Sequence, residues 1–308
     1  MKKTTLFFVI LLVGGFILFS INKNQSRVSP RESLAIKGSD TELQLVSNLV
    51  EAFLEKNPGV DISVTGGGSG VGIAALINGE LSFANSSRKM DDKELAQAKE
   101  RGLNIQEFNL AVDSLSIIVH SENSTQKLSI DQIGKIYKGE ITNWKEVGGK
   151  NEKIALYGRQ STSGTYNFFK NTVVKSDYSP YMLSMEGNQA IVDAVQTDKG
   201  GIGYVGVGYV RGENGQPRND IKIIPVGKDQ NSSAVSPLDD EAVRLDNYPI
   251  TRNTFQYLSQ FPQKNSLVEK FLLFEMSEQG QEIIKNSGFF AISKEDNQKN
   301  QQLLENIK

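Results

Sequence analysis

The sequence predicts an α/β protein of two lobes, built from open, mainly parallel sheets with helices on their faces. The first observation is a repeated alternation of short apolar strands with helical patterns. The second is the length, because 308 residues are enough for two lobes that each bury a core. The third is a pair of expected chain crossings, near residues 112–116 and near Pro249. We therefore expect residues 34–115 and 249–308 to form lobe 1, and residues 116–248 to form lobe 2.

The N-terminus has the pattern of an export signal. Lys2 and Lys3 precede an uncharged, mostly apolar run over residues 4–21, and a polar linker is expected over residues 22–33. The run is at the lower edge of what spans a bilayer, and Phe19-Ser20-Ile21 makes a poor cleavage site. A removed signal peptide and an uncleaved membrane anchor both remain open. Either one places the rest of the chain outside the cytoplasmic membrane.

Composition excludes several classes of site. The chain has no cysteine and one histidine, His120, which removes disulfides, thiolate metal sites, a cysteine nucleophile and the acylated cysteine of a lipoprotein. A formal net charge of -2 gives no general attraction for nucleic acid. We therefore expect no metal, no cofactor and no nucleic-acid partner. Any anion must be held by a local site.

The elements of lobe 1 follow in three strand-loop-helix units. Apolar residues at helical spacing follow the first strand and end at Asn57, while the second helix ends at Asn78-Gly79. The strands are predicted over residues 34–36, 60–64 and 81–84, and the helices over 43–56, 71–77 and 91–101.

The elements of lobe 2 continue the same alternation. Helices are predicted over residues 130–137 and after Gly164, and strands over 154–157 and 201–206. A last helical stretch over residues 266–286 is rich in apolar residues, so we expect it to pack back on lobe 1.

Four turns rich in Gly, Ser and Thr stand where predicted strands lead into helices. A helix N-terminus offers unpaired N–H groups and about half a positive charge, so it can hold a phosphate-like anion. Capping alone would explain any single turn, but their coincidence predicts an oxyanion site at the carboxyl ends of the strands. The turns cover residues 38–41, 66–70, 85–88 and 159–165.

Two arginines and one aspartate in these turns carry charge. Arg88 and Arg159 each offer a planar fork that matches two oxygens of one anion, although a surface ion pair remains the alternative for each. Asp40 is predicted first as a helix N-cap and second as a ligand residue.

Asp113 is a carboxylate within an apolar strand near the expected hinge. A buried acceptor would favour hydrogen phosphate, which has a proton to donate, over sulfate, which has none at neutral pH. The alternatives are a hinge salt bridge and an exposed strand residue.

Taken in order, these segments resemble the phosphate-binding proteins of bacterial phosphate ABC transporters, the PstS-like family. The resemblance runs from about Leu34 to Ile292 and implies a type II periplasmic binding protein of the Venus-flytrap kind. Its most specific segments are residues 38–41, 66–75, 84–88, 136–144, 158–165 and 201–206.

The resemblance implies that two lobes close on a dehydrated phosphate and that an ABC permease then receives it. We expect a monomeric, non-enzymatic receptor outside the cytoplasm; the alternatives are a tethered phosphate sensor or scavenger, and a phosphoesterase on the same scaffold.

The chain departs from the family at Gln160, where an acid is common, so the countercharge of Arg159 is unassigned. Asp113 matches an aspartate of related members, and the implied ligand residues are Ser39, Thr41, Ser69, Gly70, Ser87, Arg88, Arg159, Ser163, Gly164 and Thr165.

Overall fold

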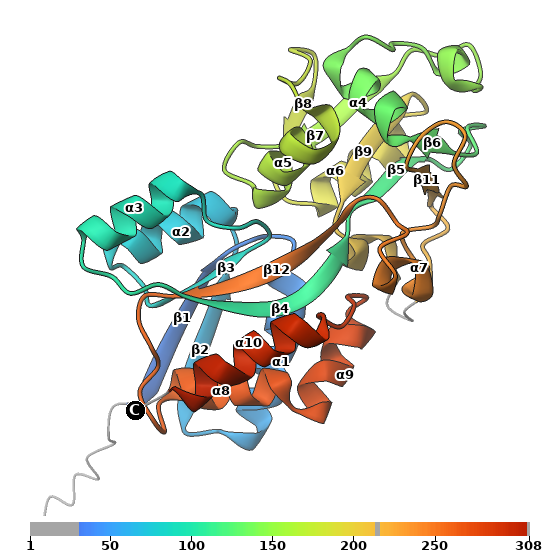
Figure 1. Ribbon diagram of the computed structural model, residues 1–308. Coiled ribbons are helices and arrows are strands. Elements are labelled where there is room, and N and C mark those ends of the chain that lie inside the picture. The colour runs from blue at the N-terminus through green and yellow to red at the C-terminus, as the bar shows by residue number, and fades with distance from the viewer. Residues whose placement is uncertain (1–30, 213–215, 307–308) are drawn as a thin grey trace, which may run out of the picture. The chain divides into compact units, whose positions relative to one another are not determined.

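Two five-stranded sheets, each flanked by helices, form the α/β architecture of the protein (Figure 1). The structure, a computed structural model, describes residues 31–212 and 216–306. The expected signal or anchor over residues 4–21 lies outside these ranges, as does most of the expected linker over 22–33; Glu32 and Ser33 already belong to the first strand. Within the described ranges, none of the helices has the length and apolar character needed to cross a bilayer.

The first sheet combines strands from both ends of the described chain. Strand β1 pairs in parallel with β2 and β3, whereas β12 is inserted antiparallel between β3 and β4. Its order is β2 (Val60–Thr65), β1 (Glu32–Gly38), β3 (Phe83–Ser86), β12 (Thr251–Leu258) and β4 (Gln106–Ser114).

The second sheet is built from the middle of the chain. Strand β7 pairs in parallel with β8 and β9, and β5 lies antiparallel to both β9 and β10. Its order is β10 (Ile221–Ile224), β5 (Ser116–His120), β9 (Gly201–Val205), β7 (Ala155–Arg159) and β8 (Leu183–Met185); a separate small pair joins β11 (Val226–Gly227) and β6 (Leu128–Ser129).

Both sheets are mixed, with parallel and antiparallel pairs in each. In each, four strands run in one direction and one interior strand is reversed: β12 in the first sheet and β5 in the second. These two strands come directly after the chain crossings. A strand that crosses between sheets enters at the edge where the other strands end, so it must run against them.

The helices begin and end where local capping predicts. Helix α4, for example, starts with a reciprocal capping box between Ser129 and Gln132 and ends at Gly139, which has φ of 80°. The helices are α1 (Leu43–Lys56), α2 (Ser69–Asn78), α3 (Asp92–Glu100), α4 (Ile130–Lys138), α5 (Gly164–Phe169), α6 (Gln189–Thr197), α7 (Asp240–Arg244), α8 (Leu267–Met276), α9 (Glu278–Asn286) and α10 (Lys294–Glu305), with short helical turns at η1 (Trp144–Val147), η2 (Lys170–Val174) and η3 (Val207–Val210).

The helical stretch expected over residues 266–286 is divided into α8 and α9. Ser277 has extended backbone angles, φ of -69° and ψ of 162°, and its hydroxyl accepts a hydrogen bond from Gly280 N. Serine favours this arrangement at a helix start, so it ends one helix and caps the next. Phe271 of α8 packs edge-on against Phe53 of α1, which joins this segment to the first sheet.

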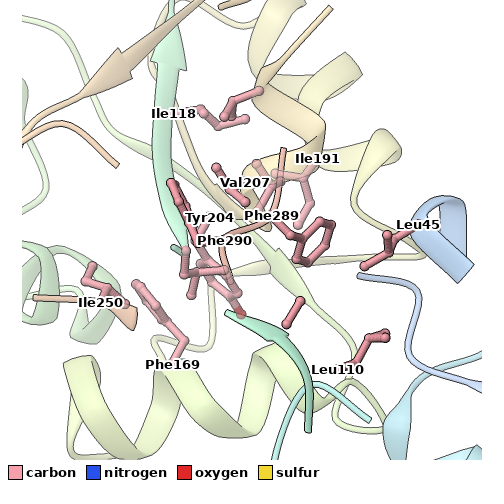
Figure 2. Close-up of a cluster of buried hydrophobic side chains, with 14 of the residues drawn as sticks. Leu45, Leu110, Ile118, Phe169, Ile191, Tyr204, Val207, Ile250, Phe289 and Phe290 are labelled. Carbon is pink, nitrogen blue, oxygen red and sulfur yellow. The ribbon is translucent and has the colours of Figure 1, made fainter. Parts of the chain in front are cut away.

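Two adjacent strands carry the chain between the sheets. Strands β4 and β12 pair along their whole length, and Figure 1 shows them as a long twisted ribbon. Next to this ribbon, Leu115 N donates to Ile250 O at 2.9 Å, and the hydroxyl of Tyr248 donates to Leu115 O at 2.7 Å. Buried apolar side chains form one cluster across this crossing (Figure 2), so the crossing is well packed as well as hydrogen-bonded.

Candidate functional site

The four predicted turns lie at strand ends, and three of them lead into a helix. Residues 38–41 are followed directly by Glu42, the N-cap position of α1. Residues 66–70 lead into α2, which begins at Ser69, and residues 159–165 lead into α5, where the hydroxyl of Ser163 caps the first turn. The turn at 85–88 follows β3, yet α3 starts only at Asp92 and has its own cap. The expectation that all four turns enter helices is therefore wrong for residues 85–88, because Asp91 supplies a stronger helix start further along.

Asp40 is also not the N-cap predicted from the sequence. The N-cap position of α1 is Glu42, which makes no side-chain capping bond. Asp40 instead accepts a hydrogen bond from Gly67 N at 2.7 Å through Oδ1 and pairs with the guanidinium of Arg159 through Oδ2. An ionised partner outweighs a helix N–H as a donor, so the carboxylate turns toward the second sheet.

Hydroxyl groups from the two sheets meet at these strand ends. Thr41 Oγ1 lies 2.8 Å from Thr165 Oγ1, and Ser69 Oγ lies 3.3 Å from Ser87 Oγ while accepting from Ser87 N at 3.0 Å. We call this group the hydroxyl cage; its residues are Ser39, Thr41, Ser69, Ser87, Ser163 and Thr165, all of them buried.

Two glycines allow the cage to be this close. Gly70 N donates to Thr162 O at 2.9 Å, which joins the start of α2 to the turn before α5 through main chain alone. A Cβ atom on Gly164 would lie 2.8 Å from Ser87 Oγ and even closer to Ser69 Oγ. Glycine is therefore required where the two walls approach, because no larger residue fits without moving a hydroxyl.

Arg159 supplies a buried positive charge at the cage. Its Nη2 pairs with Asp40, which provides the countercharge that the sequence left unassigned because Gln160 is uncharged. Its Nε and Nη1 atoms are buried and have no hydrogen-bond partner in the described part of the chain. An oxyanion would supply the acceptors that these two buried guanidinium donors lack.

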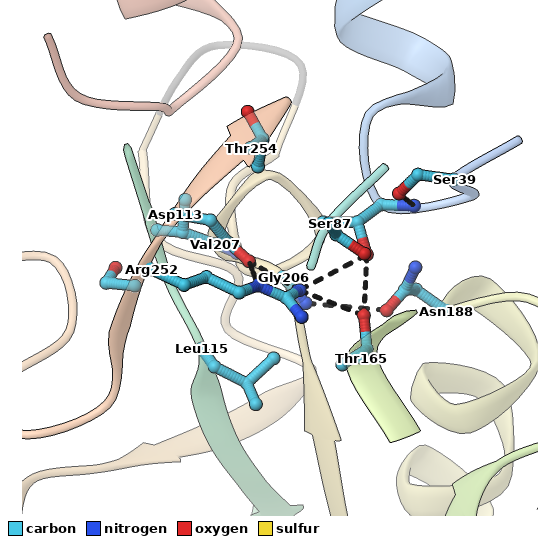
Figure 3. Close-up of polar contacts among 12 residues, drawn as sticks. Ser39, Ser87, Asp113, Leu115, Thr165, Asn188, Gly206, Val207, Arg252 and Thr254 are labelled. Atoms are coloured by element: carbon cyan, nitrogen blue, oxygen red, sulfur yellow. Dashed lines mark hydrogen bonds and ion pairs between the residues drawn. The ribbon is translucent and has the colours of Figure 1, made fainter. Parts of the chain in front are cut away.

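Arg252 of β12 is a second buried arginine at the cage, and sequence reasoning missed it. Its Nη2 donates to Thr165 Oγ1 at 2.9 Å and to Asp113 Oδ2 at 2.8 Å, and Figure 3 shows the guanidinium between these two residues. Its Nη1 is buried without a partner among the described residues. The guanidinium also lies over the ring of Phe168, 5.1 Å from the ring centre.

Both carboxylate oxygens of Asp113 accept hydrogen bonds from other residues of the protein. Oδ2 accepts from Nε and Nη2 of Arg252 at 3.0 and 2.8 Å, and Oδ1 accepts from Val207 N at 2.8 Å. Asp113 and Arg252 face one another on β4 and β12, at the crossing between the sheets. The structure thus contains an ion pair of Asp113, which is one of the alternatives that the sequence left open.

A model of the PBP superfamily domain matches residues 24–279, most of the chain. The chain belongs to the PBP superfamily.

Several known proteins resemble the chain over most of its length. It is 28% identical over 276 residues to the phosphate-binding protein PstS of Pseudomonas aeruginosa, covering 84% of this chain and 83% of the relative. It is 29% identical over 259 residues to PstS of Staphylococcus haemolyticus, with coverages of 83% and 79%. A crystal structure of a putative phosphate ABC transporter substrate-binding protein from Clostridium perfringens, solved with bound phosphate, aligns with a TM-score of 0.73 and 27% identity over 85% of this chain and all of that one.

Among the described residues of this PBP-superfamily chain, Arg88 forms no hydrogen bond with the hydroxyl cage. Its Nη1 and Nη2 atoms each donate to one carboxylate oxygen of Glu94 at 2.7 Å, and this hydrogen bonding raises the pKa of the Arg88 guanidinium. Arg88 and Arg252 line a cavity of about 550 Å³ beside the cage. Arg88 therefore forms the ion pair that the sequence gave as the alternative to a ligand role.

Proposed function

We propose that this chain is a substrate-binding protein that captures inorganic phosphate between two lobes and delivers it to an ABC permease. The observation that carries the proposal is the pair of buried Arg159 donors, Nε and Nη1, without an acceptor among the described residues. An oxyanion among the neighbouring hydroxyls would satisfy both. The names of the relatives, two phosphate-binding proteins and a putative phosphate ABC transporter substrate-binding protein, support phosphate as that oxyanion.

The proposed ligand groups come from both sides of the site. In this proposal residues 34–115 and 249–308 move against residues 116–248 about the β4 and β12 crossing, so that closure replaces the water around phosphate by fixed donors. Asp40 holds Arg159 in place and does not itself bind the ligand. The proposed ligand residues are Ser39, Thr41, Ser69, Gly70, Ser87, Arg159, Ser163, Gly164, Thr165 and Arg252.

Besides Asp40, two further residues expected as ligands are assigned other roles. Asp113 accepts hydrogen bonds from Arg252 and from Val207 N, so we place it in the hinge ion pair. Arg88 is satisfied by Glu94 at two of its nitrogens, so we place it at the entrance of the site.

Isothermal titration of the exported domain with phosphate and with sulfate tests the proposal. We expect phosphate to bind and sulfate to bind far more weakly. Arg159→Gln should weaken phosphate binding by about 100-fold or more, since two charge-assisted hydrogen bonds are lost. Arg244→Gln, which changes an exposed arginine of α7, should leave it unchanged. Equal binding of the two anions, or no binding, would contradict the proposal.

Delivery to a permease, action outside the cytoplasm and a monomeric state belong to the same proposal. Deletion of the gene should reduce phosphate uptake by cells, and the purified domain should elute as a monomer. Normal uptake together with altered gene regulation would instead favour a phosphate sensor.

A further inference from the structure

Glu42 is a buried carboxyl directly behind the hydroxyl cage. It follows Thr41 in the chain and occupies the position before α1, and its exposed fraction is 0%. Neither carboxyl oxygen has a hydrogen-bond partner in the ranges that the structure describes. The hydroxyls of Ser39, a cage residue, and Thr254 of β12 are close enough to act on this carboxyl. Glu42 thus lies on the protein side of the site, where solvent does not reach it.

A second buried carboxyl, on α8, is near enough for the charge of Glu42 to act on it. Glu275 also has an exposed fraction of 0%; its Oε1 accepts from Gln256 Nε2 at 2.8 Å, whereas its Oε2 is without a partner among the described residues. The side-chain oxygen of Gln256 lacks a donor in the same way. The cluster therefore contains buried acceptors and too few donors, and a proton on each carboxyl is the simplest supply of donors.

The groups around Glu42 both raise and lower its pKa. Burial raises the pKa of Glu42 to about 8, and the negative charge of Asp113 on β4 adds to this effect, while Arg252 on β12 and the two hydroxyls oppose it. Burial likewise raises the pKa of Glu275 to about 8, and Glu42 contributes. Desolvation outweighs the nearby arginine because the charged form of Glu42 would have no contact with water.

We infer that Glu42 is an uncharged carboxylic acid that supports the lobe 1 side of the hydroxyl cage, and that loss of its proton at alkaline pH weakens anion binding. The inference rests on the proposed phosphate-binding function. An ionised Glu42 would place a negative charge behind the bound anion, and it would draw the hydroxyl proton of Ser39 toward itself and away from the ligand. The released proton goes to solvent.

The test compares phosphate dissociation constants of the wild type and Glu42→Gln by titration calorimetry at several pH values. Taking the ratio of the two constants at each pH cancels the titration of phosphate itself. We expect a nearly constant ratio at acidic pH, followed by wild-type binding that becomes weaker than that of the variant by on the order of tenfold above about pH 8. Glu51→Gln, an exposed change on the same helix, should give a flat ratio throughout. A flat ratio for Glu42→Gln as well would overturn the inference.

A second measurement needs no ligand and separates this inference from the proposed function. A raised pKa in the folded state means that the wild type loses stability, relative to Glu42→Gln, as the pH rises from 4.5 to about 8. Urea unfolding across that range should show this difference even if phosphate did not bind. A pH-independent difference would refute the neutral state of Glu42, while failure of phosphate to bind at any pH would refute only the proposed function.

If Glu42→Gln does not fold, proton uptake by the wild type on binding phosphate is measured instead. Net uptake near pH 8 is the expected result, and its absence overturns the inference.

Discussion

The ion pair between Asp113 and Arg252 allows a prediction that separates a hinge role from a ligand role. The exposed fractions of the two side chains are 0% and 3%, and Arg252 donates two hydrogen bonds to the carboxylate. In Asp113→Asn, Arg252 loses its countercharge, and the new amide group must point an N–H either at Arg252 or at Val207 N. Removing one partner of a buried pair costs about 3–5 kcal/mol, which corresponds to a fall in Tm of about 6–10 °C for a chain of this size.

Calorimetric unfolding of the wild type, Asp113→Asn, Arg252→Gln and the double variant measures this energy as a double-mutant cycle. We expect each single variant to lose stability and the double variant to lose less than the sum, with a coupling energy above about 1 kcal/mol. The ratio of phosphate to sulfate affinity should stay the same in Asp113→Asn if the carboxylate acts only through Arg252 and Val207. An unchanged Tm together with a lost preference for phosphate would refute the hinge role and restore Asp113 as the ligand acceptor.

Two further predictions follow from the closeness of the cage walls and from the second buried carboxyl. Gly164→Ala should weaken phosphate binding by about tenfold or more, because its methyl group would collide with Ser69 Oγ, whereas Gly59→Ala, with nothing within 4 Å, should bind normally in the same titration. Glu275→Gln should become progressively more stable than the wild type as the pH rises from 4.5 to about 8, by about 1.4 kcal/mol per unit of pKa difference, since the charged form is disfavoured only in the folded state. Urea unfolding at both ends of this range checks the second prediction, and equal stabilities at high pH would contradict it.

Local sequence signals predicted the elements well because their causes are local. The apolar spacing of α1 and the Ser129 capping box of α4 act within a few residues, so the sequence shows them directly. The reversed strands could not be predicted in this way. The insertion of β12 between β3 and β4 joins segments more than 100 residues apart, and no local pattern specifies it.

The candidate site shows the same limit. The Gly, Ser and Thr turns were found because each has a recognisable local composition, and the structure brings Thr41, Ser69, Ser87 and Thr165 together. Arg252 was missed because a single arginine in a strand reads as an exposed residue. One signal was available: Arg252 stands next to the expected crossing at Pro249, as Asp113 stands next to the other, and two opposite charges at paired crossings indicate an ion pair.

The position of β4 has a consequence for the order in which the chain folds. Within its sheet, β4 has hydrogen-bonded strand pairing only with β12, which the ribosome completes after every strand of the second sheet. Until then β4 has an unpaired edge, a state prone to aggregation, and the first sheet can contain only β1, β2 and β3. The second sheet has all its strands earlier. The protein is therefore expected to mature from its middle outward, and truncation before residue 251 should leave the N-terminal third unable to reach its native fold.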